Sequence, residues 1–295
     1  MKTVSELRDV NGRLIVVEGR EVRPSLIREV STLGRPLQIK LVSLNRADFL
    51  KDLEKVLQEP LYEKIFRSES DRLRVHREVR KIRIQKALYQ ELCRLKKSSS
   101  YTYRHFLLIA ALAMHMAGCL KKLGYQPREA FVYGLLHDLG KTRLSSRILN
   151  KKVRLTSAEY KVLRSYPVYS LLLLKYYLGK KGTEACRVAY EHHETLDGKG
   201  YPLGIRKLSK YTSLVAILDI FDALVSDRPY RMRAFTVRGA LDKLIMGMHA
   251  GKFARLPVRL LVSFFRAGNP NFRTLQLSKT PRDPEPEGNC YGKTV

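Results

Sequence analysis

The sequence predicts a mainly α-helical protein that begins with a small strand-containing unit. Two observations predict the helical part: hydrophobic residues recur at helical spacing over most of the chain after residue 46, and no strand-like run competes with them after Tyr101. A third observation predicts the N-terminal unit, because the first 46 residues contain β-branched and apolar runs that glycine and proline interrupt.

Within residues 1–46, two strand-like runs flank one helix-like segment. The runs cover residues 12–19 and 35–44, and the helix-like segment covers residues 25–34. We therefore expect a small α+β unit here. The next stretch, residues 47–100, changes to helical periodicity and is expected to form a helical connector of two or three helices.

The following region is punctuated by residues that start and stop helices. One helix is expected over residues 103–123, and a second is expected to run from Pro127, a residue favoured in the first turn, toward Gly140. Thr156 and Glu159 have the spacing of a capping box, which predicts another helix start.

The composition limits the classes of protein that this chain can be. Hydrophobic residues make up 44% of the 295 residues, which is enough to fill at least one sizeable core. The longest apolar run, residues 106–120, is shorter than the ~20 residues that a membrane span needs, and the N-terminus lacks the apolar stretch of a signal peptide. We therefore expect a cytoplasmic protein. Residues 267–295 are rich in proline, glycine and charge, which predicts a disordered tail.

The chain is strongly basic, with 56 Lys+Arg against 28 Asp+Glu and a formal net charge of +28. Such an excess is compatible with nucleic acid, an anionic membrane surface, a phosphate-bearing small molecule or a solvated basic surface. Basic residues are dense over residues 72–97, where the pattern favours a solvated helix face over a nucleic-acid-binding stripe.

Several histidines and carboxylates occupy positions suited to metal binding. His137 and Asp138 follow an apolar helix and precede a glycine, so both can project from a helix end into a pocket. Asp219 lies inside the apolar segment 213–225, where a buried carboxylate needs a cation or a partner. Together with nearby imidazoles, these residues make a mixed nitrogen and oxygen ligand set that suits iron, manganese, cobalt or zinc and can hold two metals.

Four segments carry this chemistry in order along the chain: YTYRH, LLHDLGK, EHHETLDGKGYP and LDIFDALVSDRPYR. With them the chain, from Tyr101 to about Phe265, resembles the HD-GYP family of bacterial phosphodiesterases, a branch of the HD superfamily of metal-dependent phosphohydrolases. The resemblance implies an HD-type helical bundle over residues 101–266, preceded by the small N-terminal unit.

The resemblance also implies a reaction, which is the hydrolysis of cyclic di-GMP to pGpG or GMP in bacterial second-messenger signalling. Its cofactors would be two divalent metal ions, iron or manganese, with Asp138 as their bridge and with Lys141 beside it in catalysis. The implied metal ligands are His105, His137, Asp138, His192, His193 and Asp219. The implied substrate-binding residues are Lys141, Lys199, Gly200, Tyr201, Pro202, Arg228 and Arg231.

One position departs from the family pattern. The family has a histidine ligand in the sequence HPxxG, whereas here Tyr166 precedes the proline and Ser170 replaces the glycine. Because a phenol with a pKa near ~10 is protonated at neutral pH, Tyr166 is a poor substitute for an imidazole. We therefore expect a weakened second metal position, which keeps Asp138, His192 and His193.

Three functions remain open at this point. The first is an active cyclic di-GMP phosphodiesterase, the second is a degenerate domain that binds cyclic di-GMP or a protein partner without turnover, and the third is a basic nucleic-acid-binding adaptor. A diguanylate cyclase or another signalling protein, and a second copy of the chain, are also compatible partners. We interpret His76, His115 and His249 as core or solvated histidines. Asp222 can cap a helix or pair with Arg228 or Arg231 without touching metal, and Glu194 can be a helix-end carboxylate rather than a catalytic base.

Overall fold

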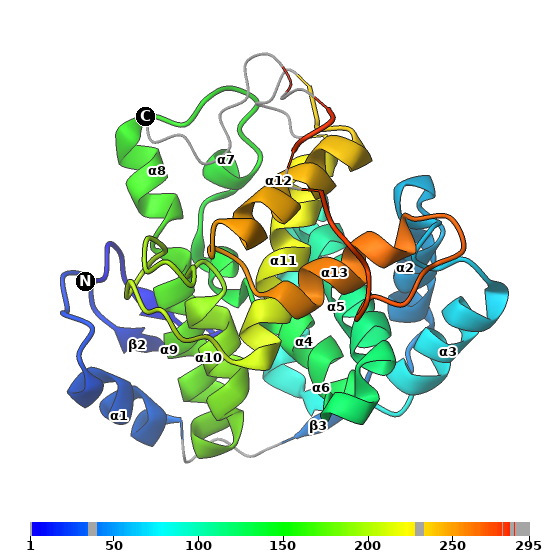
Figure 1. Ribbon diagram of the computed structural model, residues 1–295. Helices are drawn as coiled ribbons and strands as arrows, with labels where there is room; N and C mark the ends of the chain where they lie inside the picture. The colour runs from blue at the N-terminus through cyan, green and yellow to red at the C-terminus, as the bar shows by residue number, and fades with distance from the viewer. Residues whose placement is uncertain (1, 35–39, 228–232, 279, 284–285, 287–295) are drawn as a thin grey trace.

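A computed structural model describes residues 2–34, 40–227, 233–278, 280–283 and 286 of the chain (Figure 1). Most of the described residues that form regular structure lie in helices, and the strands form only two small two-stranded sheets, so the predicted mainly α-helical class is confirmed. Two expected substrate-binding residues, Arg228 and Arg231, lie outside the described residues.

The N-terminal segment forms a hairpin followed by a helix. Strand β1 (Leu7–Arg8) pairs antiparallel with β2 (Leu14–Val16), and helix α1 (Pro24–Leu33) then packs against α9 (Tyr166–Leu178). Figure 1 shows the hairpin and α1 beside α9 and α10 at one side of the molecule. Hydroxyl oxygens on α9 accept the backbone N–H groups of Val4 and Val10, so this segment docks directly on the bundle.

A second small sheet joins two segments that are far apart in the sequence. Strand β3 (Leu41–Ser43) pairs antiparallel with β4 (Arg83–Gln85), with Val42 opposite Ile84. Strand β4 lies in the region where we expected helices alone, so that expectation was incomplete. A three-residue strand between two helices leaves no periodic signal, and its partner strand supplies most of its stability.

The remaining described elements are helical. The first part of the bundle comprises α2 (Ala47–Leu57), α3 (Glu69–Val79), α4 (Lys86–Ser98), α5 (Ser100–Cys119) and α6 (Pro127–Leu136). The second part comprises the short helices α7 (Ser146–Leu149) and α8 (Ser157–Leu163), and then α9, α10 (Thr183–Glu191), α11 (Lys210–Val225), α12 (Val237–His249) and α13 (Arg255–Phe264). The 3-10 helices are η1 (Pro60–Tyr62), η2 (Lys121–Leu123), η3 (Leu139–Arg143) and η4 (Gly179–Gly182).

Local sequence explains where several helices begin. The predicted capping box before α8 is present, with Glu159 N–H donating to the Thr156 hydroxyl and Thr156 N–H donating to the Glu159 carboxylate. The helix expected over residues 103–123 begins earlier, at Ser100, because the Ser99 hydroxyl accepts the N–H of Thr102 as an N-cap. It ends at Cys119, and a 3-10 turn completes the predicted span.

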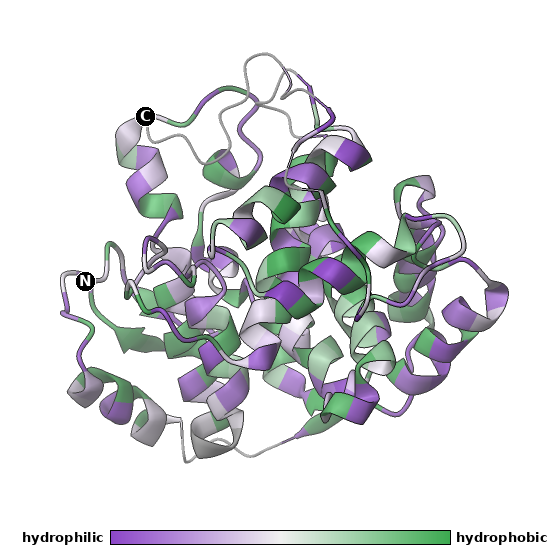
Figure 2. Ribbon diagram, viewed as in Figure 1, coloured by the Kyte–Doolittle hydropathy of each residue, from purple (hydrophilic) through white to green (hydrophobic). Residues whose placement is uncertain are grey.

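One hydrophobic core runs through the molecule, from Leu7 in the hairpin to Phe264 at the end of α13. Helix α5 is its centre, because nearly every side chain from Thr102 to Ala117 is buried. Outer helices such as α3 instead alternate hydrophilic and hydrophobic residues around their circumference (Figure 2). A buried central helix places any polar residue that it carries, such as His105, away from bulk solvent.

The described part of residues 267–295 forms no helix or strand but does contact the bundle. Arg259 donates to the carbonyl of Leu275 at 2.6 Å, and the N–H of Arg282 donates to the carboxylate of Asp242 at 2.8 Å. The division of the chain at residues 46, 100 and 266 remains a prediction. Among the described residues, no helix has both the length and the hydrophobicity that crossing a membrane would require.

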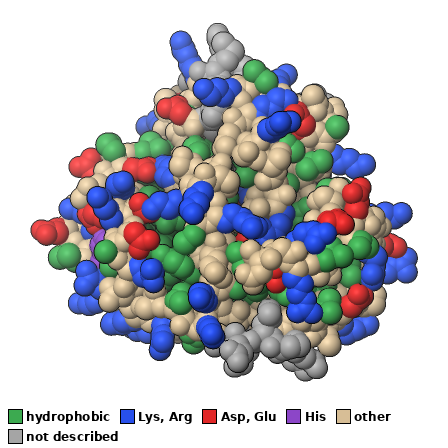
Figure 3. Space-filling model, turned by 180° about the vertical axis from the view of Figure 1, so that it is seen from behind, with side chains coloured by type: hydrophobic (Ala, Val, Ile, Leu, Met, Phe, Trp, Pro, Cys, Tyr) green, Lys and Arg blue, Asp and Glu red, His purple; other side chains and the backbone are tan. Residues whose placement is uncertain are grey.

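The basic residues of α3, α4 and the turn between them are partly neutralised by acidic neighbours. Arg74 pairs with Asp71, Lys81 with Glu78, and Lys96 with Asp52. Figure 3 shows Lys and Arg side chains distributed over the face seen from behind, with acidic side chains between many of them. This arrangement is typical of a solvated surface and gives no support to a nucleic-acid-binding stripe.

Candidate metal centre

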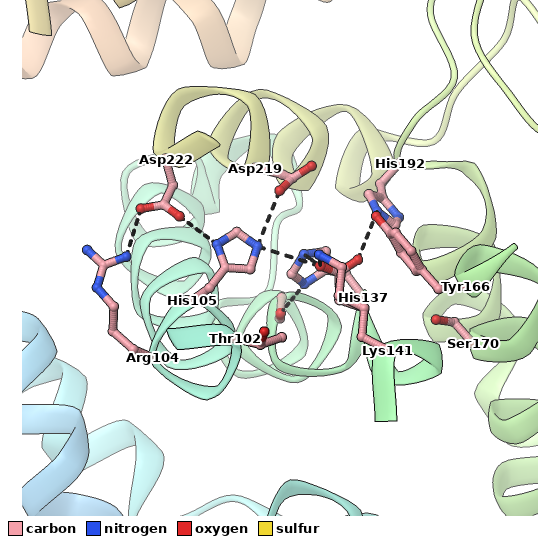
Figure 4. Close-up of polar contacts among 12 residues, drawn as sticks. Thr102, Arg104, His105, His137, Lys141, Tyr166, Ser170, His192, Asp219 and Asp222 are labelled. Atoms are coloured by element: carbon pink, nitrogen blue, oxygen red, sulfur yellow. Dashed lines mark hydrogen bonds and ion pairs between the residues drawn. The ribbon is translucent and has the colours of Figure 1, made fainter. Parts of the chain in front are cut away.

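Four of the six expected metal ligands meet where α5, α6 and α11 pack together (Figure 4). His105 lies in the second turn of α5, and Asp219 lies on α11. His137 and Asp138 come directly after the last residue of α6, where the chain enters η3. Their ligand atoms all lie within 4.8 Å of one another, and all four side chains are buried.

The atoms of this first group face a common point. Nε2 of His105 lies 3.2 Å from Oδ1 of Asp219 and 3.7 Å from Oδ2 of Asp138. Nε2 of His137 lies 3.3 Å from the same Asp138 oxygen. Both Nε2 atoms and Oδ1 of Asp138 are buried and have no hydrogen-bond partner among the described residues. Because buried polar atoms normally have partners, these three atoms fit a site built for a metal ion.

Asp138, His192 and His193 form a second group, whose ligand atoms also lie within 4.8 Å of one another. His192 follows the last residue of α10, and its Nε2 lies 3.3 Å from Oδ1 of Asp138. Asp138 therefore belongs to both groups, with Oδ2 near His105 and His137 and Oδ1 near His192. A carboxylate in this position can bridge two metal ions.

Backbone carbonyls orient two of the imidazole rings. Nδ1 of His137 lies 2.7 Å from the carbonyl oxygen of Gly134, and Nδ1 of His192 lies 3.1 Å from that of Val188. Since a carbonyl only accepts, each Nδ1 carries the proton and each Nε2 presents a lone pair to the metal groups.

Asp222 orients the third ring, that of His105. Its Oδ2 accepts from Nδ1 of His105 at 2.6 Å, and its Oδ1 accepts from the hydroxyls of Tyr62 and Ser226 and from Arg104 at 3.0 Å. Burial alone would raise the pKa of Asp222. The hydrogen bond and charge of His105 instead hold this pKa well below its ordinary value. We considered Arg228 or Arg231 as its partner, but Arg104 pairs with it in the described structure.

Replacing Asp222 with asparagine is expected to weaken metal binding without removing a ligand. The amide would no longer stabilise the Nδ1–H of His105 by charge, and such outer partners are typically worth about 10- to 100-fold in metal affinity. Metal titration of the purified protein measures this effect. The matched control is Asp48→Asn on α2, where the carboxylate is exposed, and an unchanged affinity in Asp222→Asn would contradict the assigned role.

The protonation states of the two groups suit metal binding. Burial alone would raise the pKa of Asp138, but the charges of His137 and Lys141 hold it well below its ordinary value. Burial lowers the pKa of His137, and it lowers that of His193 further. His105 differs, because its contacts with the negatively charged Asp219 and Asp222 of α11 raise its pKa in spite of burial. An ionised carboxylate and neutral imidazoles are the forms that bind metal. Because the pKa of His105 is raised, a metal ion that binds this imidazole would have to displace a proton.

Tyr166 lies at the second group. Its hydroxyl contacts Nε2 of His193 and lies 3.2 Å from Nε2 of His192. Burial and the charge of Asp138 hold the pKa of Tyr166 well above its ordinary value, so the side chain is a neutral phenol. The hydroxyl therefore contacts the two ring nitrogens through which the second group would bind a metal.

Gly140 fixes the position of Tyr166. A Cβ at this residue would lie 2.0 Å from the carbonyl oxygen of Tyr166 and 2.6 Å from the backbone nitrogen of Ser170. The Gly140 N–H also donates to the Ser170 hydroxyl at 2.7 Å. The first turn of α9 is thus held directly against η3, which only a glycine at this position permits.

Residues 194–204 form a tight loop beside the second group. The Glu194 carboxylate accepts the N–H groups of Leu203 and Gly204, so Glu194 holds the loop closed rather than ending a helix. Gly200 passes so close to Glu194 that a Cβ would lie 2.3 Å from its Cα. This path stacks the Tyr201 ring on the His193 ring, with centroids 4.6 Å apart and planes 14° apart.

The expected substrate-binding residues occupy different environments. Nζ of Lys141 forms an ion pair with Asp138 and lies 4.7 Å above the Tyr166 ring. Tyr201 and Pro202 are half-buried on the loop, whereas Lys199 is exposed. The sequence interpretation missed Arg164, whose guanidinium lies over the Tyr201 ring at 4.1 Å. Arg164 belongs to no motif, and only the folded loop brings it near the metal groups.

The fold and the paired groups define a helical domain whose buried His and Asp clusters could hold metal ions. A family model described as an HD domain matches residues 81–253, and the chain belongs to this family. The match begins before Tyr101, so the family region includes α4 as well as the motif-bearing helices.

Curated relatives confirm the resemblance to bacterial phosphodiesterases of this family. A cyclic di-GMP phosphodiesterase of Pseudomonas aeruginosa is 38% identical over 144 residues, covering 48% of this chain and 34% of that protein. A 3′3′-cGAMP-specific phosphodiesterase of Vibrio cholerae is 34% identical over 138 residues, covering 45% of this chain and 31% of that protein. The chain thus spans about a third of the length of these relatives. A solved HDG"Y"P protein from Bdellovibrio bacteriovorus aligns with 87% of this chain and 95% of its own at a TM-score of 0.40 and 14% identity.

Proposed function

We propose that this protein is a metal-dependent phosphodiesterase that hydrolyses cyclic di-GMP to pGpG or GMP in bacterial signalling. The observation that carries the proposal is the position of Asp138, whose two oxygens face two separate groups of candidate ligands. Phosphodiester hydrolysis at a pair of metal ions uses this arrangement, and the names of the curated relatives support the substrate.

In this proposal each group holds one divalent ion, iron or manganese. His105, His137 and Asp219 would hold the first ion, His192 and His193 would hold the second, and Asp138 would serve both. Bound ions of this kind supply positive charge and activate water for attack on a phosphodiester.

The chain's own residues orient the substrate. Lys141 lies beside Asp138 in the middle of η3, where its ammonium could neutralise a phosphate oxygen as a point charge. Tyr201 stacks over His193 of the second group, and Gly200 permits the close path of the loop that carries Tyr201 and Pro202. Lys199, Arg228 and Arg231 complete the proposed substrate-binding set.

Turnover by metal-loaded protein tests the proposal. Purified protein is reconstituted with iron or manganese, its metal content is measured, and cyclic di-GMP, pGpG and GMP are followed by chromatography. We expect linear product to appear only in the metal-loaded sample. A sample that has full metal occupancy and leaves cyclic di-GMP intact would refute the enzymatic proposal.

A specific observation favours a second candidate function, which is binding of cyclic di-GMP without turnover. The Tyr166 hydroxyl contacts the ring nitrogens of both His192 and His193, and a neutral phenol offers these nitrogens a hydrogen bond instead of a metal. If the second ion is excluded in this way, the loop and the first group remain able to bind the dinucleotide. Calorimetry that shows tight binding together with no turnover would favour this candidate.

Under the second candidate function, in which the second ion is excluded, Tyr166→His is expected to raise the metal content from about one to about two ions per chain, because an imidazole is a ligand for such metals at neutral pH. Elemental analysis of the purified variant measures this content, and turnover is expected to rise with it. Tyr166→Phe is the matched control, because it removes the hydroxyl without supplying a ligand. Two ions already bound to the wild-type protein would contradict the expected blocking role of Tyr166.

A further inference from the structure

Arg164 occupies a distinctive position at the edge of the metal centre. It follows the last residue of α8 and is half-buried. Its guanidinium carbon lies 4.1 Å from the centroid of the Tyr201 ring, which in turn stacks on His193 at 4.6 Å. A single aromatic ring therefore separates this cation from a candidate metal ligand.

No carboxylate pairs with Arg164 among the described residues, and its guanidinium makes no hydrogen bond with them. Other buried or half-buried arginines near the site are paired, since Arg104 contacts Glu59 and Asp222, and Arg143 contacts Glu91. A guanidinium stacked on a ring keeps the N–H groups of its edge free, because the ring occupies only its flat face. Arg164 is thus held in place while its donors stay available to an anion.

A cyclic dinucleotide at this site would bring a negative charge that the cation of Arg164 could bind. A cyclic dinucleotide carries two phosphodiester groups, and only one of them can be cut at the metal groups at a time. Lys141 is already paired with Asp138 and lies on the η3 side of the centre. The second phosphodiester needs a positive partner elsewhere, and a planar guanidinium matches two phosphate oxygens in a bidentate arrangement.

We propose that Arg164 binds the phosphodiester group of the cyclic dinucleotide that is not being cut. This inference rests on the proposed function, because it assumes that a cyclic dinucleotide occupies the metal centre. Tyr201 then has a positioning role as well, since its ring fixes the guanidinium between the loop and α8.

The test compares Arg164→Gln and Arg164→Lys with the wild-type protein on two substrates. Cyclic di-GMP has the second phosphodiester, whereas bis(p-nitrophenyl) phosphate has only the one that is cut. Arg164→Gln is expected to raise KM for cyclic di-GMP, or its calorimetric Kd, by about 10- to 100-fold, which is the range for one charged hydrogen-bonded contact. Its kcat on both substrates is expected to stay close to the wild-type value. The KM or Kd of Arg164→Lys for cyclic di-GMP is expected to lie between those of the wild-type protein and Arg164→Gln, because an ammonium still attracts phosphate.

The matched control is Arg128→Gln, which removes the same charge at the exposed N-terminal end of α6, about 13 Å from His137 along the helix. Equal KM or Kd in Arg164→Gln and the control would overturn the inference. An equal loss on bis(p-nitrophenyl) phosphate would also overturn it, because Arg164 would then only support the loop. Failure of the proposed function is seen separately, as wild-type protein that neither binds nor cuts cyclic di-GMP.

Discussion

Asp138→Asn is expected to abolish turnover of cyclic di-GMP, with a loss of at least about 1000-fold, and to release metal from both ligand groups. The substitution keeps the size of the side chain but removes the charge that both groups share. It also leaves the ammonium of Lys141 without its anionic partner, so the charge at the centre becomes more positive. Product formation and metal content are measured on the same sample.

Comparison with His192→Ala tests whether Asp138 serves both ligand groups. His192 belongs only to the second group, so this variant should keep the first ion and lose the second. If Asp138→Asn lost no more metal than His192→Ala, Asp138 would serve a single ion and the bridging role would be wrong. Thermal melting of both variants without metal verifies that the bundle is still folded.

Three of the six candidate ligands could be predicted from their local context in the sequence, whereas His105, His192 and His193 were implied by the family resemblance of the segments that contain them. Asp219 interrupts an apolar helix, and His137 with Asp138 precedes a glycine at a helix end. These contexts are short-range, so they survive in a single sequence. The structure brings all six expected ligands into two overlapping groups, although their roles in binding metal stay a prediction.

The partners of those ligands could not be predicted in the same way. Asp222 contacts Tyr62, which is 160 residues away in the sequence, and Arg104, which is 118 residues away. Arg164 lies over the ring of Tyr201, and Tyr201 belongs to the loop that Glu194 holds closed. Such contacts depend on how helices pack, and the periodicity of one segment carries no information about which distant segment it meets.

The same limit applies to the N-terminal part of the chain. Strands β2 and β3 lie within the predicted runs, of which residues 35–39 are outside the described residues, and helix α1 overlaps the predicted helix-like segment, but strand β1 was not predicted. The pairing of β3 with β4 was not predicted either, because β4 lies 40 residues further along. The composition suggested a self-contained unit, whereas the hairpin donates backbone N–H groups to tyrosines of α9. Those tyrosines have an ordinary hydrophobic pattern, so nothing local marks them as anchors.

Breaking the buried ion pair between Glu91 and Arg143 is expected to cost about 3–5 kcal/mol of unfolding free energy. The Glu91 side chain is 0% exposed and that of Arg143 is 7% exposed, and the Tyr177 hydroxyl donates to the same Glu91 oxygen at 2.7 Å. Either Glu91→Leu or Arg143→Met would leave the other charge buried without its partner. Urea denaturation of each variant measures the loss.

Replacing both partners at once distinguishes this mechanism from a simple loss of packing. The double variant Glu91→Leu with Arg143→Met leaves no buried charge, so it should be far more stable than either single variant. The exposed pair of Arg20 and Glu29 is the control, and its removal should cost at most about 1 kcal/mol. Single variants as stable as that control would contradict the prediction. Because Arg143 ends the 3-10 helix that carries Lys141, the single variants should also lose turnover, which would link the stability of α4 to the geometry of the metal centre.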